Sequence, residues 1–367
     1  MKVLQINKED LKHNIDVIKE KAKRTETKII AVVKGNGYGL GIVEYSKFLI
    51  DNGIEMLAVS TVEDAVKLRE AGIKADILMM SSTCIEEDVK VLIENNIIIT
   101  LGSELAVKIA DDIARKFSVN IRAHLKIDTG FGRYGFLYNS LEKLIDALKE
   151  TTNIKIEGTF SHFSQAYAKN EKWTKIQFDR FIAAVSYLEN NKINPGIVHI
   201  CNSSAFLRYP NMHLNAVRIG SAFLGRIIVQ NNIGLKKIGV LKTQISELKM
   251  LPKGYNIGYS NAFKTKRTTK VAIVPVGYYD GYNVRNYPDS YRTIDKIRYL
   301  YNAIKDLFKD KKLKIKIDNK KYRLLGKIGM YHMVIDITGN DKIKQGDEIY
   351  LDINPLYVDS SIRREFV

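Results

Sequence analysis

Short apolar runs rich in β-branched residues alternate with longer amphipathic stretches over roughly the first 225 residues of the chain. This alternation is typical of parallel sheets, in which a helix joins each strand to the next, rather than of antiparallel ones. The amphipathic stretches, such as 61–69, 103–116 and 172–188, repeat apolar residues at three- and four-residue spacing, as helices with one buried face do. Eight strands are predicted, near residues 29–33, 55–60, 76–80, 96–101, 121–127, 155–161, 197–201 and 216–219.

Eight strand–helix units in a segment of this length fit a (β/α)8 TIM-type barrel better than an open doubly wound sheet. A Rossmann fold is disfavoured because no G-x-G-x-x-G follows the first strand. After a polar connection at residues 230–237 the pattern changes. We therefore predict an α/β protein with a barrel over residues 1–232 and a second domain over residues 233–367.

Period-two alternation predicts that the second domain is mostly β. One segment near residues 295–311 instead has helical spacing and places its apolar residues on one face. We expect this inserted helix to pack locally or against a partner chain. The expected strands lie near residues 242–248, 270–276, 312–317, 322–328 and 348–353, and the apolar face of the helix comprises Ile297, Leu300, Tyr301, Ile304, Leu307 and Phe308.

The composition provides enough apolar residues for two hydrophobic cores, and the charge indicates which kinds of ligand the protein attracts. The chain has 367 residues, of which 45% are hydrophobic, and its formal net charge is +17. Lysines are scattered and no aromatic-interleaved motif accompanies them, so a solvated basic surface that attracts anionic ligands is favoured over nucleic-acid binding. Without an N-terminal apolar segment or a long apolar run, we expect a cytoplasmic protein with no membrane partner. Cys84 and Cys201 are predicted to be reduced thiols.

Lys34 directly follows the first predicted strand of the barrel and precedes a glycine-rich segment, residues 35–41. The strand holds the lysine in place, partial burial would lower its pKa, and the glycines let a bulky ligand approach the backbone. These conditions suit a lysine that forms an imine with a carbonyl group. A strand-end lysine that points into solvent is the alternative.

Other polar residues fall at or just beyond the C-terminal ends of the later strands, where barrel enzymes build their active sites. The glycine after the last strand would let backbone N–H groups reach a phosphate. Three features together indicate a pyridoxal phosphate site. They are a lysine that can form an imine, backbone N–H groups that can bind a phosphate, and an arginine between them. The residues at these strand ends are Lys126, residues 128–133, His162, Asn202, Ser203, Arg218 and Gly220.

Five segments carry a resemblance to a known family. Residues 31–39 (Ala-Val-Val-Lys-Gly-Asn-Gly-Tyr-Gly), 124–133, 217–220, 258–260 and 274–282 are similar to motifs of the alanine racemases, which are barrel-type pyridoxal phosphate enzymes. The resemblance covers essentially the whole chain. The last two motifs lie in the second domain, which small one-domain relatives of the barrel lack.

The resemblance implies two catalytic bases, Lys34 and Tyr259, with Tyr259 contributed by the partner subunit of a head-to-tail homodimer. Racemisation needs two such groups because inversion requires that a planar carbanion is protonated on the face opposite to the one that lost the proton. A phenol is a poor base at neutral pH unless positive charge lies nearby. The resemblance supplies such an influence, since it implies that His162 contacts Tyr259 and that Arg218 contacts His162.

The same resemblance implies the cofactor and substrate contacts. Arg218 would face the pyridine nitrogen and, being permanently charged, would disfavour its protonation, which favours racemisation over decarboxylation. Lys126 matches a position that is carbamylated in relatives and then orients Arg133; a salt bridge is its alternative role. The remaining implied contacts are phosphate binding by Tyr38, Ser203 and Gly220, binding of the cofactor's phenolic oxygen or the substrate carboxylate by Arg133, and a substrate pocket that includes Met330 and Tyr331.

Three features depart from the family pattern. Tyr331 replaces an aspartate, Phe366 stands near the position of a phosphate-binding tyrosine, and the inserted helix follows soon after residues 278–282, near the expected entrance. We predict an isomerase that interconverts L- and D-alanine, a precursor of peptidoglycan, with shifted or broadened side-chain specificity. The alternatives are an amino-acid decarboxylase of the same fold and a non-catalytic pyridoxal phosphate-binding protein.

Overall fold

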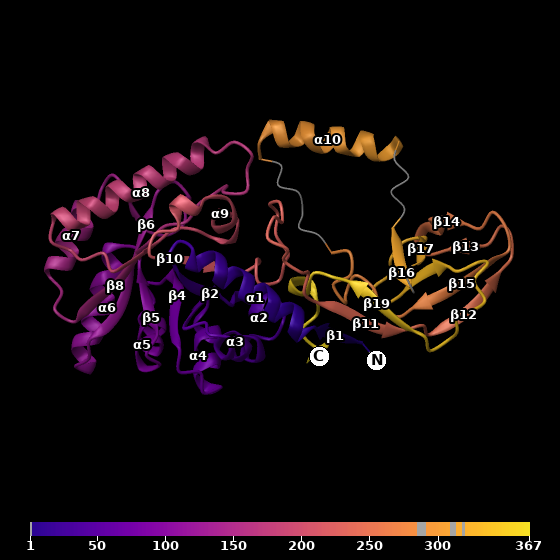
Figure 1. Ribbon diagram of the computed structural model, residues 1–367, viewed down its shortest axis with the longest axis horizontal. Helices are drawn as coiled ribbons and strands as arrows, with labels where there is room; N and C mark the ends of the chain where they lie inside the picture. Colours follow the sequence, from indigo (N-terminus) through magenta and orange to yellow (C-terminus); the bar gives the residue numbers. More distant parts are fainter. Residues whose placement is uncertain (1, 285–290, 309–312, 318–319) are drawn as a thin grey trace. The chain divides into compact units, whose positions relative to one another are not determined.

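A computed structural model of the chain describes residues 2–284, 291–308, 313–317 and 320–367 (Figure 1). The chain divides into two compact units, Lys8–Ile238 and Met1–Asn7 with Gly239–Val367.

This division differs from the predicted boundary at residue 232 in two respects. Strand β1 (Val3–Ile6) belongs to the second unit, because it pairs with β11 (Val240–Gln244) and β20 (Arg363–Phe366). The first unit extends to Ile238, whose N–H donates to the carbonyl of Leu224 at 2.9 Å.

The first unit is a closed barrel of eight parallel strands surrounded by helices, as predicted (Figure 1). Each strand pairs in parallel with its neighbours, and the β5–β6 and β10–β2 pairings close the ring. Its strands are β2 (Lys28–Val32), β3 (Met56–Val59), β4 (Asp76–Ser82), β5 (Ile98–Leu101), β6 (Ile121–Asp128), β8 (Ile154–Phe160), β9 (Ile197–His199) and β10 (Ala216–Ile219), with the two-residue β7 (Phe136–Leu137) paired to β6.

The helices of the barrel begin and pack where the sequence pattern places them. In α6, Ser103 caps the N-terminus by accepting a hydrogen bond from the N–H of Ala106 at 3.2 Å. Thr61 caps α4 in the same way. The longer helices bury one apolar face, as in α6, where Val107, Ala110 and Ile113 are buried. The helices of this unit are α1 (Lys8–Lys23), α2 (Lys34–Tyr38), α3 (Ile42–Asp51), α4 (Val62–Glu70), α5 (Glu86–Glu94), α6 (Glu104–Phe117), α7 (Glu142–Lys149), α8 (Lys172–Asn190), α9 (Ser203–Arg208) and the 3-10 turn η1 (Pro210–Met212).

The second unit is mostly β, as predicted. One sheet has the order β19-β11-β1-β20, a second has the order β12-β15-β18-β17-β16, and β13 pairs with β14. Alternate residues point inward, as in β16, where Ile315 and Ile317 are buried between exposed lysines. Its other elements are β12 (Glu247–Leu251), β13 (Asn256–Ile257), η2 (Tyr259–Asn261), β14 (Phe263–Lys264), β15 (Thr269–Val274), β16 (Lys314–Ile317), β17 (Lys320–Leu325), β18 (Met333–Asp336), β19 (Glu348–Asp352) and η3 (Pro355–Tyr357).

The inserted helix of the second unit is α10 (Thr293–Phe308); residues 309–311 of the predicted span lie outside the described residues, as does residue 312 at the start of one predicted strand. Four residues of its predicted apolar face are exposed, Ile297 (57%), Leu300 (62%), Tyr301 (62%) and Ile304 (47%), and the side chains of Leu307 and Phe308 lie outside the described part. Local packing of that face is therefore not found among the described side chains, and packing against a partner chain stays a prediction. No helix in the described ranges is both long and apolar enough to cross a membrane.

Candidate active site

Lys34 stands at the start of a left-handed turn. Strand β2 ends at Val32, and residues 35–38 all have φ between 53° and 64°. A left-handed turn costs about 1–2 kcal/mol for each residue that carries a Cβ atom, and Gly35 and Gly37 avoid this cost. A Cβ atom on Gly37 would also lie 3.1 Å from the ring of Tyr45. The glycines after the lysine therefore serve first to reverse the chain.

A cavity at the C-terminal ends of the strands brings five predicted site residues together. Lys34, Lys126, Arg133, His162 and Arg218 all line it, and it encloses about 710 Å³ including the solvent at its mouth. The remaining lining residues are Ser60, Met80, Ser81, Tyr134 and Phe160. All ten belong to the first unit. The barrel alone thus assembles most of the predicted cationic groups around one space.

The charge of this cavity affects the Lys34 amine. The Lys34 side chain is exposed to the cavity, yet the surrounding protein partly desolvates its amine and so lowers its pKa, and the nearby positive charges of Arg133 and Arg218 lower it further. A lower pKa increases the fraction of the amine that is neutral near pH 7. Only the neutral amine can attack a carbonyl carbon or accept a proton.

Arg218 is held from two directions by β8 and β9. Its guanidinium is 3% exposed and donates to the carbonyl oxygen of Ser161 at 2.7 Å, to Nδ1 of His162 at 2.9 Å and to Nδ1 of His199 at 2.8 Å. Both Nη atoms are used in this way. In the described part of the chain, Nε of Arg218 makes no hydrogen bond. Burial lowers the pKa of Arg218 to about 10, so it remains charged at neutral pH.

The hydrogen bonds of Arg218 determine the tautomers of three histidines. Because the guanidinium has only N–H donors, Nδ1 of His199 and Nδ1 of His162 must be acceptors. The proton of neutral His199 then lies on Nε2, which donates to Nδ1 of His124 at 3.1 Å. Burial is the main cause that lowers the pKa of all three histidines, to about 4 for His124 and well below the usual range for His162 and His199. Hydrogen bonds therefore run from Arg218 to His162, and from Arg218 through His199 to His124. We call these three neutral imidazoles the histidine relay.

Lys126 lies on β6 and is 4% exposed. Its ammonium donates to the carbonyl of Ile127 at 3.0 Å and lies 5.1 Å from the ring centre of Phe160. Burial, with Arg218 nearby, lowers the pKa of Lys126 to about 7. The salt bridge considered from the sequence is not found among the ion pairs of the described residues. Lys126 is therefore a buried, largely unpaired amine.

The loop after β6 is organised by Asp128. Its carboxylate accepts hydrogen bonds from the N–H groups of Gly130, Phe131 and Gly132 at 2.8–2.9 Å. This turn presents Arg133, whose guanidinium carbon lies 4.5 Å from the ring centre of Phe131. The loop thus brings a fourth cation to the cavity.

Tyr38, Ser203 and Gly220 follow β2, β9 and β10, respectively, and lie close together. The N–H groups of Gly220 and Ala222 donate to Oγ of Ser203 at 3.1 and 3.3 Å. A Cβ atom on Gly220 would come within 2.3 Å of the Tyr38 hydroxyl, so the glycine makes room for that ring. Burial raises the pKa of Tyr38 to about 12, which keeps the hydroxyl protonated. Hydroxyl and backbone donors are therefore concentrated at one point.

Three predicted residues lie in the second unit. Tyr259 is 72% exposed and stands between Gly258 (φ 79°) and Ser260 (φ 58°), in a turn that projects the ring outward. Gly329 lies close to it, since a Cβ atom there would be 3.7 Å from Cε2 of Tyr259. Met330 and Tyr331 follow directly, and both are exposed.

Around that surface, Tyr331 packs against Tyr279 with ring centres 5.2 Å apart. The backbone N–H groups of Tyr278 and Tyr279 hold the Gly329–Met330 segment by donating to its two carbonyls at 3.1 Å. Tyr259, Met330 and Tyr331 thus belong to one aromatic surface. Phe366 lies in β20, paired with Ile6.

The predictions omitted several residues that line the cavity or support it. Ser60 follows β3 directly, Ser81 lies near the end of β4 and donates to the Ser60 carbonyl at 2.9 Å, and His199 ends β9. Each occupies the same strand-end position that singled out Lys34. Applying that criterion to every polar residue would have identified them. The contact between His124 and His199 has no such signal, because 75 residues separate the two in the chain.

Comparisons with known proteins agree with this arrangement. The family "Alanine racemase, N-terminal domain" matches residues 6–228, and "Alanine racemase, C-terminal domain" matches residues 238–355. The chain is 35% identical to an alanine racemase of Clostridium tetani, over 95% of this chain and 84% of that protein. It is 31% identical to an alanine racemase of Methanococcus maripaludis, over 94% of this chain and 87% of that protein.

Solved structures show the same likeness. The alanine racemase of Clostridium difficile 630 has a TM-score of 0.87 and 26% identity, covering 100% of this chain and 95% of that one. The same protein in complex with cycloserine has a TM-score of 0.84 and 25% identity, with the same coverage.

Proposed function

Because the chain belongs to the alanine racemase family, we propose that it interconverts L- and D-alanine, with pyridoxal phosphate as cofactor, in a homodimer that shares its active sites. It is an alanine racemase-like isomerase, and proteins of this family use pyridoxal phosphate. The observation that carries the proposal is the Lys34 amine in one cavity with Arg218 and Arg133, which lower its pKa.

The residues present fit the cofactor. Lys34 would hold it covalently, and the cluster of Tyr38, Ser203 and Gly220 has the hydroxyl and N–H donors that a phosphate needs. Arg218 has an N–H on Nε that no group in the described part of the chain accepts, while its Nη atoms are anchored. That remaining donor suits an unprotonated ring nitrogen. When bound, the cofactor withdraws electrons from the α-carbon of the amino acid and so makes its proton acidic.

The protein's own groups then move that proton. Lys34, neutral in part because its pKa is lowered, accepts or donates a proton on one face of the α-carbon. We assign the opposite face to Tyr259 of a second copy, because its exposed ring is free to enter a neighbouring site. His162 would orient that phenol, since its Nδ1 accepts from Arg218 and its Nε2 therefore carries the only proton of the neutral ring.

Arg218 also argues against the decarboxylase alternative. A guanidinium cannot give up its proton to the ring nitrogen, whereas a carboxylate at this position would keep that nitrogen protonated and stabilise a long-lived carbanion. A short-lived carbanion favours rapid return of the proton. The non-catalytic alternative leaves the exposed turn around Tyr259 without a role.

Isotope exchange tests the proposed reaction. Purified protein with its cofactor is incubated with each L-amino acid in deuterated water, and loss of the α-proton signal and of optical rotation is followed. Racemisation predicts that alanine loses both together without releasing carbon dioxide. Release of carbon dioxide, or no exchange with any amino acid, would contradict the proposal.

The same measurement tests specificity. We propose that Tyr331 shifts or broadens side-chain preference, because a bulky uncharged ring stands against Tyr279 beside Met330. Substitution Tyr331→Asp should then alter the ratio of exchange rates for larger amino acids relative to alanine. An unchanged ratio would exclude this role.

We also propose that Lys126 is carbamylated. With a pKa of about 7, much of the amine is neutral at physiological pH. Its nitrogen can form a bond to the carbon of carbon dioxide and release one proton, which leaves a carbamate anion facing Arg133 and Arg218. A carbamate resonance in protein equilibrated with 13C-bicarbonate, absent in Lys126→Met, is expected; its absence from the unsubstituted protein would disprove the modification.

A further inference from the structure

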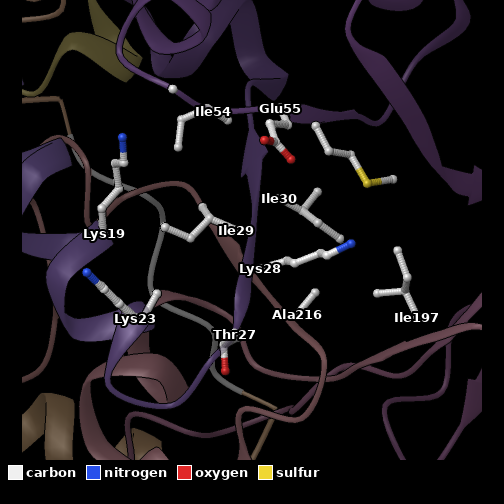
Figure 2. Close-up of a pocket in the computed structure, with 13 residues that line it drawn as sticks. Lys19, Lys23, Thr27, Lys28, Ile29, Ile30, Ile54, Glu55, Ile197 and Ala216 are labelled. Atoms are coloured by element: carbon white, nitrogen blue, oxygen red, sulfur yellow. The ribbon is translucent and has the colours of Figure 1, made fainter.

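The barrel has a second pocket at its other end, where the strands begin (Figure 2). It lies where four neighbouring strands start, β9, β10, β2 and β3. It encloses about 700 Å³ including the solvent at its mouth. None of its lining residues lines the cavity around Lys34. The proposed racemase reaction makes no use of it.

The floor of this pocket is apolar and leads into the interior of the barrel. Ile30 and Ala216 line it and belong to a buried apolar cluster of the barrel, and Met56 and Ile197 line it and pack against that cluster. Ile54 and Ile29 form further walls beside them (Figure 2). Apolar surface in a concave pocket gains free energy when a hydrocarbon group displaces its water. The floor therefore favours an alkyl or similar group.

The rim of the pocket is cationic. Lys19, Lys23 and Lys28 surround it together with one acid, Glu55, and all four are exposed (Figure 2). Among the ion pairs of the described residues, none involves any of these four side chains. Lys19 donates only to the carbonyl of Asn52, at 2.9 Å. Three lysines against one glutamate leave an excess of two positive charges, and within the described ranges no carboxylate pairs with any of the three lysines.

We propose that this pocket binds a small amphiphilic carboxylate, with its apolar group on the isoleucine-rich floor and its anionic group among the three lysines. The two halves of the pocket select this class together. An alkyl ammonium ion would be repelled by the rim, and a polyanion without an apolar group would leave the floor hydrated. In Figure 2 the side chain of Lys28 runs between Ile30 and Ala216, and Lys19 and Lys23 lie on the other side of Ile29. The flexible stem of Lys28 therefore lets its ammonium meet a carboxylate whose alkyl group occupies the floor.

Three probes of equal length test the proposal: hexanoate, hexanol and hexylammonium. They are titrated into the full-length protein labelled at isoleucine methyl groups. Hexanoate should shift the methyl resonances of Ile29, Ile30, Ile54 and Ile197 with a Kd on the order of 1 mM, and added salt should weaken it. Hexanol should bind at least about fivefold more weakly because it lacks the charge, and hexylammonium should not saturate. Ile127, at the other end of the barrel, should not respond.

Two lysine variants provide the matched comparison. Lys28→Met removes a rim charge and should weaken hexanoate at least about threefold while leaving hexanol unchanged. Lys47→Met removes an exposed charge from α3, outside the pocket, and should change neither. Equal binding of hexanoate and hexanol, or no shift of the four isoleucines, would overturn the proposal. Because the readout does not use racemisation, failure of the proposed function leaves this result interpretable.

Discussion

The two ends of one barrel contrast in how they hold positive charge. At the C-terminal end Lys126 and Arg218 are buried and Lys34 is exposed to the cavity beside them, and loss of solvent contact lowers the pKa of all three. At the N-terminal end Lys23 and Lys28 are exposed around an apolar floor. The same eight strands support both ends. The two ends therefore differ less in how many cations they hold than in how closely those cations lie together and how far the protein shields them from solvent. We expect the first arrangement to support a reaction and the second to support binding alone.

The sharpest test of this contrast removes one lysine from each end. Lys34→Ala should lower kcat for alanine racemisation by roughly 10³-fold or more, because a covalent anchor and a base are lost together. Polarimetry on the cofactor-loaded protein measures it, with Lys28→Met as the control that should stay within about twofold. A Lys34→Ala protein that retains more than a tenth of the activity would refute the assigned role.

Removal of the buried cation should cost stability as well as activity. Arg218→Met leaves the Ser161 carbonyl and the Nδ1 atoms of His162 and His199 without their donor. Each buried acceptor left without its donor costs about 1–3 kcal/mol, so we expect the unfolding free energy to fall by about 3 kcal/mol. Urea unfolding of the cofactor-free protein measures this loss. A loss below about 1 kcal/mol would show that the network relaxes or recruits water.

The histidine relay should matter less than the arginine that it holds. His199→Phe leaves an N–H of Arg218 and Nδ1 of His124 unpaired, so we expect a loss of about 2 kcal/mol. The freed guanidinium should also lower kcat more than it raises KM, because its position matters most when the proton moves. Equal changes in both kinetic constants would indicate general damage instead.

Lowering the pH should reduce the free energy of unfolding through the buried histidines at the C-terminal end of the barrel. A histidine whose pKa is lowered by folding binds fewer protons in the folded state, so its contribution is full above about pH 6.5 and declines as the pH falls toward its folded pKa. For His124, with a folded pKa of about 4, the loss at pH 5.5 is about 1 kcal/mol. Urea midpoints at pH 7.5 and 5.5 measure the combined effect of the three histidines and of Lys126, whose pKa of about 7 lies in the same interval. His199→Phe should show a smaller difference, and an equal one would contradict this origin.

The smallest effect is expected at the exposed rim. Lys28→Met should change the free energy of unfolding by less than about 0.5 kcal/mol, because no ion pair among the described residues involves Lys28. The same urea titration measures it. A larger loss would mean that the rim helps to hold the barrel together, and the contrast between the two ends would narrow.

Several parts of the site followed from local pattern. The strand that ends at Val32 and the glycines after Lys34 were visible because strand and turn signals are local. The alternation of strands and helices predicted the barrel, and the barrel implied that strand ends such as Lys126 and Arg218 would meet. The left-handed sense of the turn after Lys34 was not predicted, although its glycines were.

Other parts depended on contacts between distant segments. β1 belongs to the second unit because its backbone pairs with β11 and β20, and a four-residue apolar run carries no mark of which sheet it will join. The link between His124 and His199 likewise requires β6, β8 and β9 to be in register.

The sequence by itself determined the order of elements, the family and the lysine with its glycine turn, because these depend on spacing along a few adjacent residues. Only the tertiary structure decided which cations are buried, which tautomers the histidines adopt and where an apolar pocket opens between strand starts. Burial and hydrogen-bond direction depend on groups that the closed ring of strands brings together from far apart in the chain.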